Sequence, residues 1–138
     1  MSERVFFDSN ILFYSFDSSE AGKQSIAQEM LADSIVSGLG WISVQVLGEF
    51  FHATVIRKKL MSVKNAEKAI LSLSALGVMD VDFALVRDAI SLHRRYQTSY
   101  WDSLIIATAK RCHCSRLITE DLNHDQEIEG LRIINPFV

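Results

Sequence analysis

Four acidic residues stand where a folded chain could bring their carboxylates together. Asp8 directly follows the first apolar run, and Asp121 follows a late one. Asp102 lies in the first turn of a segment predicted to form a buried helix, and Glu49 lies on another predicted helix. Because converged carboxylates repel one another and resist burial, a cation must compensate them. Oxygen ligands alone select Mg²⁺ or Mn²⁺ over zinc, and the natural chemistry of such a site is in-line hydrolysis of a phosphodiester.

Each of these acids also has an ordinary structural interpretation. Asp8 could cap a following helix, and Asp121 could be a turn residue. Glu49 could lie on a solvated helix face. Asp102 fits a capping box that begins at Ser99, in which its carboxylate would bond back to the cap amide. Spacing alone therefore leaves both a metal site and four independent acids open.

The segments that must position the acids alternate between strands and helices. Short apolar runs predict strands at 5–7, 41–42, 78–79, 116–119 and 131–134. Helical spacing and capping residues predict helices over about 21–37, 43–59, 62–77, 82–96 and 99–107. Gly77 is predicted to end the third of these helices. The alternation implies an α/β fold of three layers, with a small parallel sheet between helices. In such folds ligands bind at the carboxyl ends of the strands.

Length and composition restrict the class of protein. The chain has 138 residues, which predicts a single domain over 1–138. Hydrophobic residues make up 49% and there is one proline, which excludes disorder and collagen-like repeats. No apolar run approaches the ~20 residues of a membrane span, the start lacks the apolar stretch of a signal peptide, and two cysteines are too few for a disulfide framework. We therefore expect a cytoplasmic protein with no membrane segment.

Basic residues are concentrated in the middle of the chain. The formal net charge is −3, yet residues 51–116 hold most of the lysines and arginines. Without the four acids the remaining chain would be slightly basic, so a filled metal site would repel a polyanion less. The candidate RNA phosphate contacts are Arg57, Lys58, Lys59, Arg94 and Arg95. Tyr14, Tyr100 and Trp101 could stack on unpaired bases or pack in the protein.

The runs that surround the acids carry a family resemblance. They are Val5–Leu12 (VFFDSNIL), Ser43–Phe50 (SVQVLGEF), Ser99–Ile105 (SYWDSLI) and Ile118–Leu122 (ITEDL), in that order. Together they resemble the PIN-domain family, especially the VapC-like toxins of prokaryotic toxin–antitoxin pairs. The resemblance extends from Val5 to Phe137.

The resemblance implies a PIN-like fold and an endoribonuclease that depends on Mg²⁺ or Mn²⁺. The family's acids fall on Asp8, Glu49, Asp102 and Asp121, which would be both the metal ligands and the catalytic set. Its supporting polar positions fall on Asn10 and Thr119. The resemblance also implies cleavage to a 5′-phosphate and a 3′-hydroxyl, a small antitoxin protein as partner, and a homodimer. Whether Glu120 or Asp125 joins the acid site stays open.

Other functions remain as alternatives to a toxin. The chain could be a PIN-type nuclease in RNA maturation or on DNA, or a non-catalytic binding module with the same fold. A zinc site at Cys112, His113 and Cys114 lacks a second pair of ligands. An aspartyl-phosphate phosphatase would need a second aspartate where this chain has Asn10.

Overall fold

A six-stranded sheet forms the middle layer of the molecule. The computed structural model describes residues 3–138. The strand order is β3-β2-β1-β4-β6-β5. The strands are β1 (Val5–Phe7), β2 (Gly40–Ser43), β3 (Gly77–Met79), β4 (Arg116–Ile118), β5 (Glu127–Ile128) and β6 (Leu131–Ile134). The five predicted strands pair in parallel, so the predicted α/β class is confirmed.

The sheet is not entirely parallel, contrary to the sequence prediction: the short strand β5 was not predicted, and it pairs antiparallel with β6. The turn between them contains Glu129 and Gly130, both at positive φ (51° and 90°). A two-residue strand is too short to show an alternating pattern. The sheet is therefore mixed at this edge.

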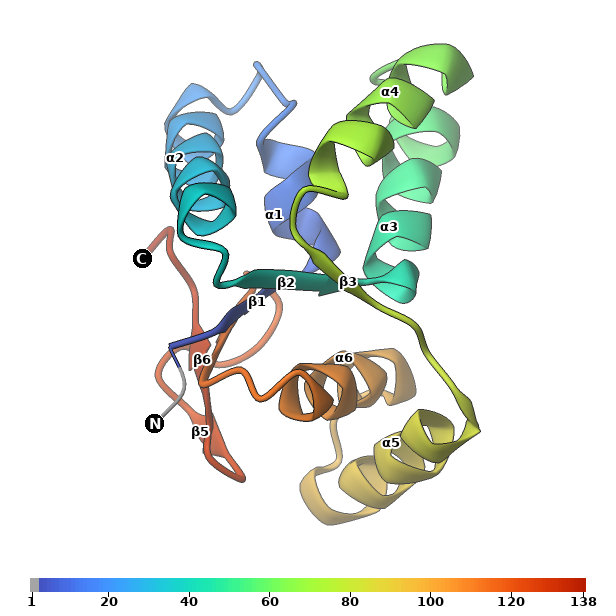
Figure 1. The fold of residues 1–138 in the computed structure, drawn as a ribbon, viewed down its shortest axis with the longest axis vertical. Coiled ribbons are helices and arrows are strands. Elements are labelled where there is room, and N and C mark those ends of the chain that lie inside the picture. Colours follow the sequence, from blue (N-terminus) through green and yellow to red (C-terminus); the bar gives the residue numbers. More distant parts are fainter. Residues whose placement is uncertain (1–2) are drawn as a thin grey trace.

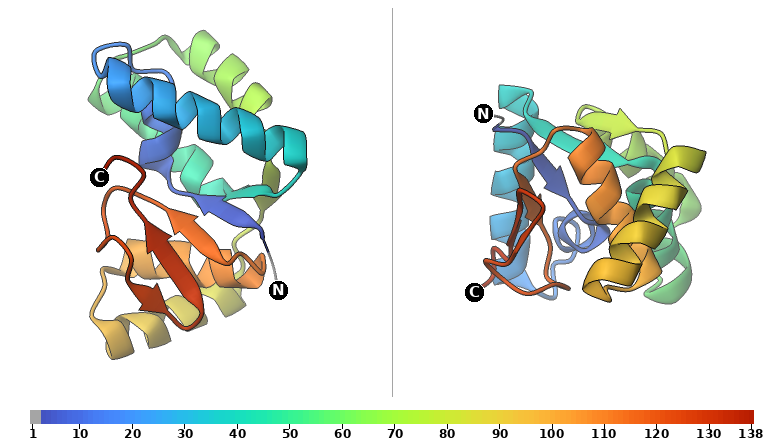
Figure 2. Two further views of the ribbon diagram at one scale, coloured as in Figure 1. Left: turned by 90° about the vertical axis from the view of Figure 1, so that its left-hand side faces the viewer. Right: turned by 90° about the horizontal axis from the view of Figure 1, so that it is seen from below.

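Helices cover both faces of the sheet, as Figure 1 shows, with α1–α4 above it and α5 and α6 below it. The left view of Figure 2 shows the same separation from the side. The helical elements are α1 (Ser9–Tyr14), α2 (Ala21–Ser37), α3 (Val44–Phe51), η1 (His52–Arg57), α4 (Val63–Leu73), α5 (Phe83–Tyr96) and α6 (Tyr100–Arg111). Among residues 3–138 no helix is long and apolar enough to cross a membrane.

Four predicted helices, those expected from residues 43, 62, 82 and 99, begin at these residues, each of which is an N-cap. Ser43, Ser62, Asp82 and Ser99 each accept a hydrogen bond from the backbone N–H three residues later. Gly38 ends α2 in the left-handed conformation, at φ 73°. These local signals gave the correct helix starts because each cap satisfies a backbone group that the helix itself leaves free.

Gly77 does not end a helix, contrary to the sequence prediction. Helix α4 ends at Leu73 with Ser74 as its C-cap, and Gly77 is the first residue of β3. A Cβ at Gly77 would lie 2.5 Å from the Trp41 ring. Glycine is needed there because the indole packs directly against the backbone.

The helix predicted over 43–59 is not uniform. Helix α3 continues at His52 into η1, a π-helical segment that ends at Arg57. The Thr54 hydroxyl is fully buried and donates to the Phe50 carbonyl at 2.8 Å, while Lys58 N–H reaches back to the Ala53 carbonyl at 2.9 Å. π-Helical turns inside helices frequently occur at functional sites.

The core lies on both faces of the sheet. Residues 103–109 of α6 are all buried, as its apolar sequence predicts. The largest fully buried side chains include Phe6, Phe7, Phe50, Ile105, Ile106 and Leu117. Burial of this kind stabilises the folded state by roughly 25 cal/mol per Å² of apolar surface. The packed core therefore holds the strands, and with them the strand ends that carry the site, in place.

Candidate active site

The site lies where β1 and β4 end side by side. Phe7 pairs with Ile118, so the next residues, Asp8 and Thr119, are neighbours across the sheet. The sheet order places β2 on one side of β1 and β4 on the other. The sheet therefore extends from β1 in opposite directions, through β2 on one side and β4 on the other. At such a switch point a crevice opens at the carboxyl ends of the strands.

Asp8 is both a helix cap and a buried member of the acid group. Its side chain is 5% exposed. Oδ1 accepts the Ser9 N–H at 2.7 Å, and Oδ2 accepts the Thr119 hydroxyl at 2.8 Å. Burial raises the pKa of Asp8 to about 7; the bonds from Thr119 and Ser9 oppose this shift, and repulsion from Glu49 and Asp121 adds to it. The two interpretations of Asp8 are compatible.

Asn10 and Thr119 connect Asp121 to Asp8. The Asn10 amide group donates to Asp121 Oδ2 at 3.1 Å and to Thr119 Oγ1 at 3.3 Å. Its own oxygen accepts the Glu120 N–H at 3.3 Å. The Thr119 hydroxyl, which is fully buried, also accepts the Asp121 N–H at 3.1 Å. The structure thus joins α1 to the loop after β4 through the two side chains that the resemblance implied as supports.

Glu49 and Asp102 approach the same region from two helices. Burial raises the pKa of Glu49, bonds from Gln45 and Ser9 lower it, and the charges of Asp102 and Asp121 raise it further. Burial also raises the pKa of Asp102, with Ser99 acting against this and Asp121 reinforcing it. Glu49, Asp102 and Asp121 therefore lie within electrostatic range of one another, and Glu49 and Asp121 lie within range of Asp8.

Only half of the predicted capping box is present at Asp102. The Ser99 hydroxyl accepts the Asp102 N–H at 3.1 Å. Within residues 3–138 no return bond joins the Asp102 carboxylate to the Ser99 amide. The Asp102 carboxylate is therefore not tied to the backbone at the helix start.

The chemistry of this donor set fits a hard divalent cation. Among the residues that the structure describes, none of the four acids forms an ion pair. Asp8 is buried, Glu49 and Asp102 are half-buried and Asp121 is exposed. Carboxylates that repel one another and have no basic partner are suited to Mg²⁺ or Mn²⁺. As placed, no three His, Cys, Asp or Glu side chains within 3–138 lie close enough together to hold a metal ion. The acids converge electrostatically but do not form a closed ligand shell.

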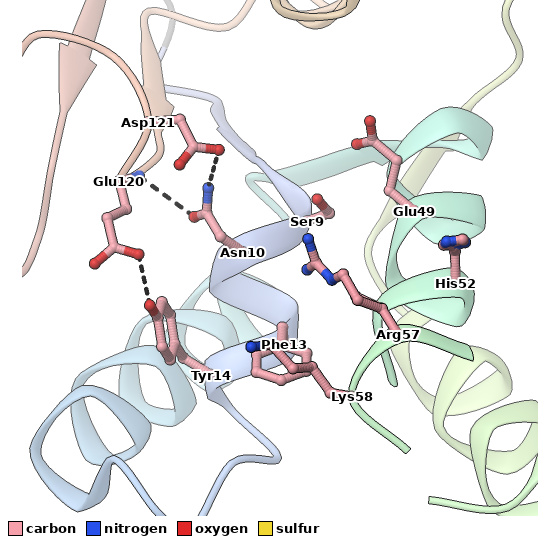
Figure 3. A pocket seen from close by; sticks show the side chains of 11 residues that line it. Ser9, Asn10, Phe13, Tyr14, Glu49, His52, Arg57, Lys58, Glu120 and Asp121 are labelled. Atoms are coloured by element: carbon pink, nitrogen blue, oxygen red, sulfur yellow. Dashed lines mark hydrogen bonds between the residues drawn. The ribbon is translucent and has the colours of Figure 1, made fainter. Parts of the chain in front are cut away.

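A cavity of about 440 Å³ opens beside the acids, between α1, η1 and the loop after β4 (Figure 3). Glu49 and Asp121 lie on its wall. Arg57 and Lys58, at the end of η1, contribute positive charge to the same wall. The complete lining is Ser9, Asn10, Phe13, Tyr14, Glu49, His52, Ala53, Arg57, Lys58, Glu120 and Asp121. The cavity therefore combines acids with two of the predicted phosphate contacts.

The other three predicted RNA contacts do not line this cavity. Lys59 is exposed and has a positive φ of 50°. Arg94 is exposed in the last turn of α5. Arg95 forms an ion pair with Glu129 at 2.6 Å and lines a second cavity, of about 450 Å³, between α5 and α6. Their role in RNA binding stays a prediction.

Glu120 belongs to a structural cluster. Its carboxylate accepts the Tyr14 hydroxyl at 2.6 Å and forms an ion pair with Lys23. The Tyr14 ring packs edge-on against Phe137, with centroids 5.2 Å apart, and lies 4.7 Å from Lys23 Nζ. Figure 3 shows Glu120 directed toward Tyr14, away from the Asp121 carboxylate. The Tyr14 ring is thus already engaged within the protein.

Asp125 lies outside the site. It is exposed, has a φ of 69° and contacts Arg132 at 3.5 Å. His124 accepts the Asn135 N–H through Nδ1 at 3.0 Å. These contacts are made by the loop that leads into β5 and do not involve the four acids.

Sequence reasoning missed Gln45 as a site residue. Its Nε2 donates to Glu49 Oε2 at 3.2 Å and to the Trp101 carbonyl at 3.3 Å. A signal was available, because residues four apart on a helix share a face and a glutamine there can bond to an acid. His52, on the cavity wall, was also missed.

Comparisons with known proteins agree with this architecture. A family model described as PIN domain matches residues 5–126. A toxin–antitoxin complex from Klebsiella pneumoniae contains a chain with a similar structure, at a TM-score of 0.68 and 20% identity, over 96% of this chain and 97% of that one. VapC20 from Mycobacterium tuberculosis, described as a toxin that cleaves the sarcin–ricin loop, has a TM-score of 0.67 and 19% identity, over 82% and 86%. No curated protein matches the sequence.

Proposed function

Since the chain belongs to the PIN domain family, we propose that it is a metal-dependent endoribonuclease and the toxin of a toxin–antitoxin pair. The observation that supports the proposal is that carboxylates from four elements interact electrostatically, without ion-pair partners within 3–138, and that two of them share a cavity with Arg57 and Lys58. The similarity in structure to a toxin that cleaves RNA supports the same function.

The four acids would hold one or two Mg²⁺ or Mn²⁺ ions. When bound, such ions activate water and stabilise the leaving oxygen of a phosphodiester. Asp8 would contribute a carboxylate whose orientation is set by Ser9 and Thr119. The Asn10 amide donates a hydrogen bond to the Asp121 carboxylate and so orients it. Fixed donors of this kind keep the acids in place during the reaction, so little reorganisation is needed.

Arg57 and Lys58 would bind the RNA backbone. They lie on the cavity wall opposite Glu120 and Asp121, as Figure 3 shows. A phosphate on this wall would meet positive charge on one side and the acids on the other. Phosphate contacts of this type position a strand without reading its sequence, which fits a backbone-cleaving role.

An antitoxin partner and a homodimer form part of the same proposal. Partner proteins would bury some of the large apolar side chains that are exposed on α4, α5 and α6; these include Phe83 (74% exposed), Leu71 (68%), Trp101 (61%) and Val63 (59%). The similarity to a chain of a toxin–antitoxin complex supports the antitoxin. Light scattering of the purified protein should give twice the mass of one chain.

The test of activity is cleavage of ribosomal RNA and transfer RNA by the purified protein. We expect 5′-phosphorylated fragments with Mn²⁺, no cleavage with EDTA, and no cleavage by Asp102→Asn. Single- and double-stranded DNA in parallel reactions distinguish a DNA nuclease. A protein that binds Mn²⁺ but cleaves none of these substrates would contradict the proposal and favour a binding module.

The test of the metal site is a thermal melt with and without Mn²⁺. At free metal one hundred times its dissociation constant, linkage predicts about 2.7 kcal/mol of stabilisation. Asp102→Asn should weaken this gain. An equal gain in the parent and in Asp102→Asn would place the ion elsewhere.

A further inference from the structure

The side chain of Gln45 lies between two of the four acids. Its Nε2 group donates one hydrogen bond to Glu49 Oε2 at 3.2 Å and one to the Trp101 carbonyl at 3.3 Å. Trp101 directly precedes Asp102 in the first turn of α6. One amide group therefore contacts the Glu49 carboxylate and the backbone that carries Asp102.

Two acceptors determine the orientation of this amide. A carboxylate and a carbonyl can only accept, so both must face the NH₂ group of Gln45. The reversed orientation would direct Oε1 at two oxygens. In the observed orientation Oε1 is buried without a hydrogen-bond partner among residues 3–138. The two hydrogen bonds to Glu49 and Trp101 thus set the orientation of the amide, and Oε1 is left without a hydrogen-bond partner among residues 3–138.

Gln45 is also the single hydrogen-bonded link between these two helices. Within the described part of the chain no other hydrogen bond and no ion pair joins α3 to α6. Asp8 and Asp121, in contrast, are joined through Asn10 and Thr119. Gln45 therefore has, between Glu49 and the start of α6, the linking role that Thr119 has between Asp8 and Asp121.

We propose that Gln45 is a positioning residue, which holds the Glu49 carboxylate in place relative to Asp102 so that both can serve one cation. This inference rests on the proposed function. Groups that orient metal ligands in this way typically contribute 10- to 100-fold to metal affinity or activity. Gln45 contacts neither the ion nor the RNA in this role; it acts through Glu49 and through the start of α6.

The test compares Gln45→Met with Gln28→Met. Methionine keeps the length of the side chain and suits a helix as well as glutamine does, but it donates no hydrogen bond. Gln28 is the matched control because its Nε2 also donates to a backbone carbonyl, that of Ser15 at 2.8 Å, on α2 rather than in the acid site. Both variants therefore lose a glutamine-to-carbonyl bond, and only one of them loses a bond to an acid.

Two readouts are measured on the purified full chain. The first is the Mn²⁺ concentration that gives half of the thermal shift, together with the Mn²⁺ concentration for half-maximal RNA cleavage. The second is amide hydrogen exchange of residues 100–103 in the metal-free protein. We expect Gln45→Met to raise both Mn²⁺ concentrations about tenfold without changing KM for RNA, and to speed exchange at 100–103. Gln28→Met should match the parent.

The possible results separate this inference from the proposed function. Parent-like Mn²⁺ affinity in Gln45→Met would overturn the positioning role, even if exchange is faster, because the bridge would then be merely structural. A parent protein that binds no Mn²⁺ would contradict the proposed function. In that case the exchange measurement decides: unchanged exchange at 100–103 overturns the link between Gln45 and α6, and faster exchange that is absent from Gln28→Met supports it.

Discussion

Asp8 and Asp121 are held by more hydrogen bonds than Glu49 and Asp102 are. We call the first group the strand half (Asp8, Asn10, Thr119 and Asp121), since it forms where β1 and β4 end. Its members are connected by four hydrogen bonds: three join side chains to one another, and in the fourth the Asp121 N–H donates to the Thr119 hydroxyl. Its buried centre, Thr119, bonds to all three of the others.

We call the second group the helix half (Gln45, Glu49 and Asp102). Its acids stand on α3 and α6, and Gln45 alone bridges these helices by hydrogen bonds within the described residues. The four acids are chemically alike, but the larger number of hydrogen bonds in the strand half means that they are not equally preorganised. Register between neighbouring strands defines one pair, and a single hydrogen-bonded bridge between two helix starts connects the other.

The largest expected effect comes from Asp8→Asn, which removes a charge from the strand half but leaves a side chain of the same shape. The Ser9 N–H can still be accepted, so the fold should persist while cleavage of RNA falls by roughly 10³-fold or more. Asp17→Asn is the control, since Asp17 is also buried (8% exposed) and accepts from Ser19 instead. Retained activity in Asp8→Asn, measured as initial rates with Mn²⁺, would remove Asp8 from the catalytic set.

The next effect tests the support of the strand half with all four acids intact. Asn10→Ala deletes the bonds to Thr119, Asp121 and the Glu120 N–H. Because small misplacements of catalytic groups are costly, we expect about a 10²-fold lower rate and a loss of about 1–2 kcal/mol in unfolding free energy.

Asn123→Ala is the control for this change, because Asn123 is exposed in the same loop and its side chain has no hydrogen bond within the described residues. The rate loss should exceed that of Gln45→Met. If Gln45→Met lowered the rate more than Asn10→Ala did, activity would depend more on the support of the helix half than on that of the strand half, which is the opposite of what we expect.

A smaller effect is expected on the cavity wall beside the helix half. Arg57→Gln removes a positive charge at the end of η1. We expect KM for RNA to rise about tenfold at low salt, and the slope of log affinity against log salt to become shallower by about 0.7 per lost contact with single-stranded RNA. Lys64→Gln, on the exposed surface of α4, should leave the slope unchanged. Equal slopes for the two variants would show that RNA does not use this wall.

The smallest effect concerns the buried charge in the strand half. Burial raises the pKa of Asp8 to about 7 from its ordinary value of 3.8, so between these values the folded chain holds a proton that the unfolded chain has released. The metal-free protein should therefore lose stability as the pH rises, by about 1 kcal/mol from pH 6 to pH 8 for this group.

Urea unfolding with EDTA at both pH values measures this dependence. Asp8→Asn should flatten it and should melt above the parent at pH 8, because the variant buries no charge. Raised pKa values at Glu49 and Asp102 act in the same direction. An equal pH dependence in the parent and in Asp8→Asn would show that Asp8 is not ionised in a buried site.

The sequence by itself determined the local parts of this protein. Helix starts at Ser43, Ser62 and Ser99 were predictable, because a cap bonds to a backbone group only three residues away. The positions of the acids relative to strand ends and helix starts followed from the same local signals. The sequence runs around the acids also indicated the family to which the chain belongs.

Only the tertiary structure decided which side chains meet. Asn10 and Asp121 are 111 residues apart in the chain, and their hydrogen bond exists because β1 and β4 are paired in register. Gln45 reaches Trp101, 56 residues further along, because the fold brings the first turn of α3 close to the first turn of α6. The sequence left the role of Glu120 open; in the folded chain its carboxylate accepts the Tyr14 hydroxyl and pairs with Lys23. Contacts of this kind depend on long-range burial and strand register, which no local spacing encodes.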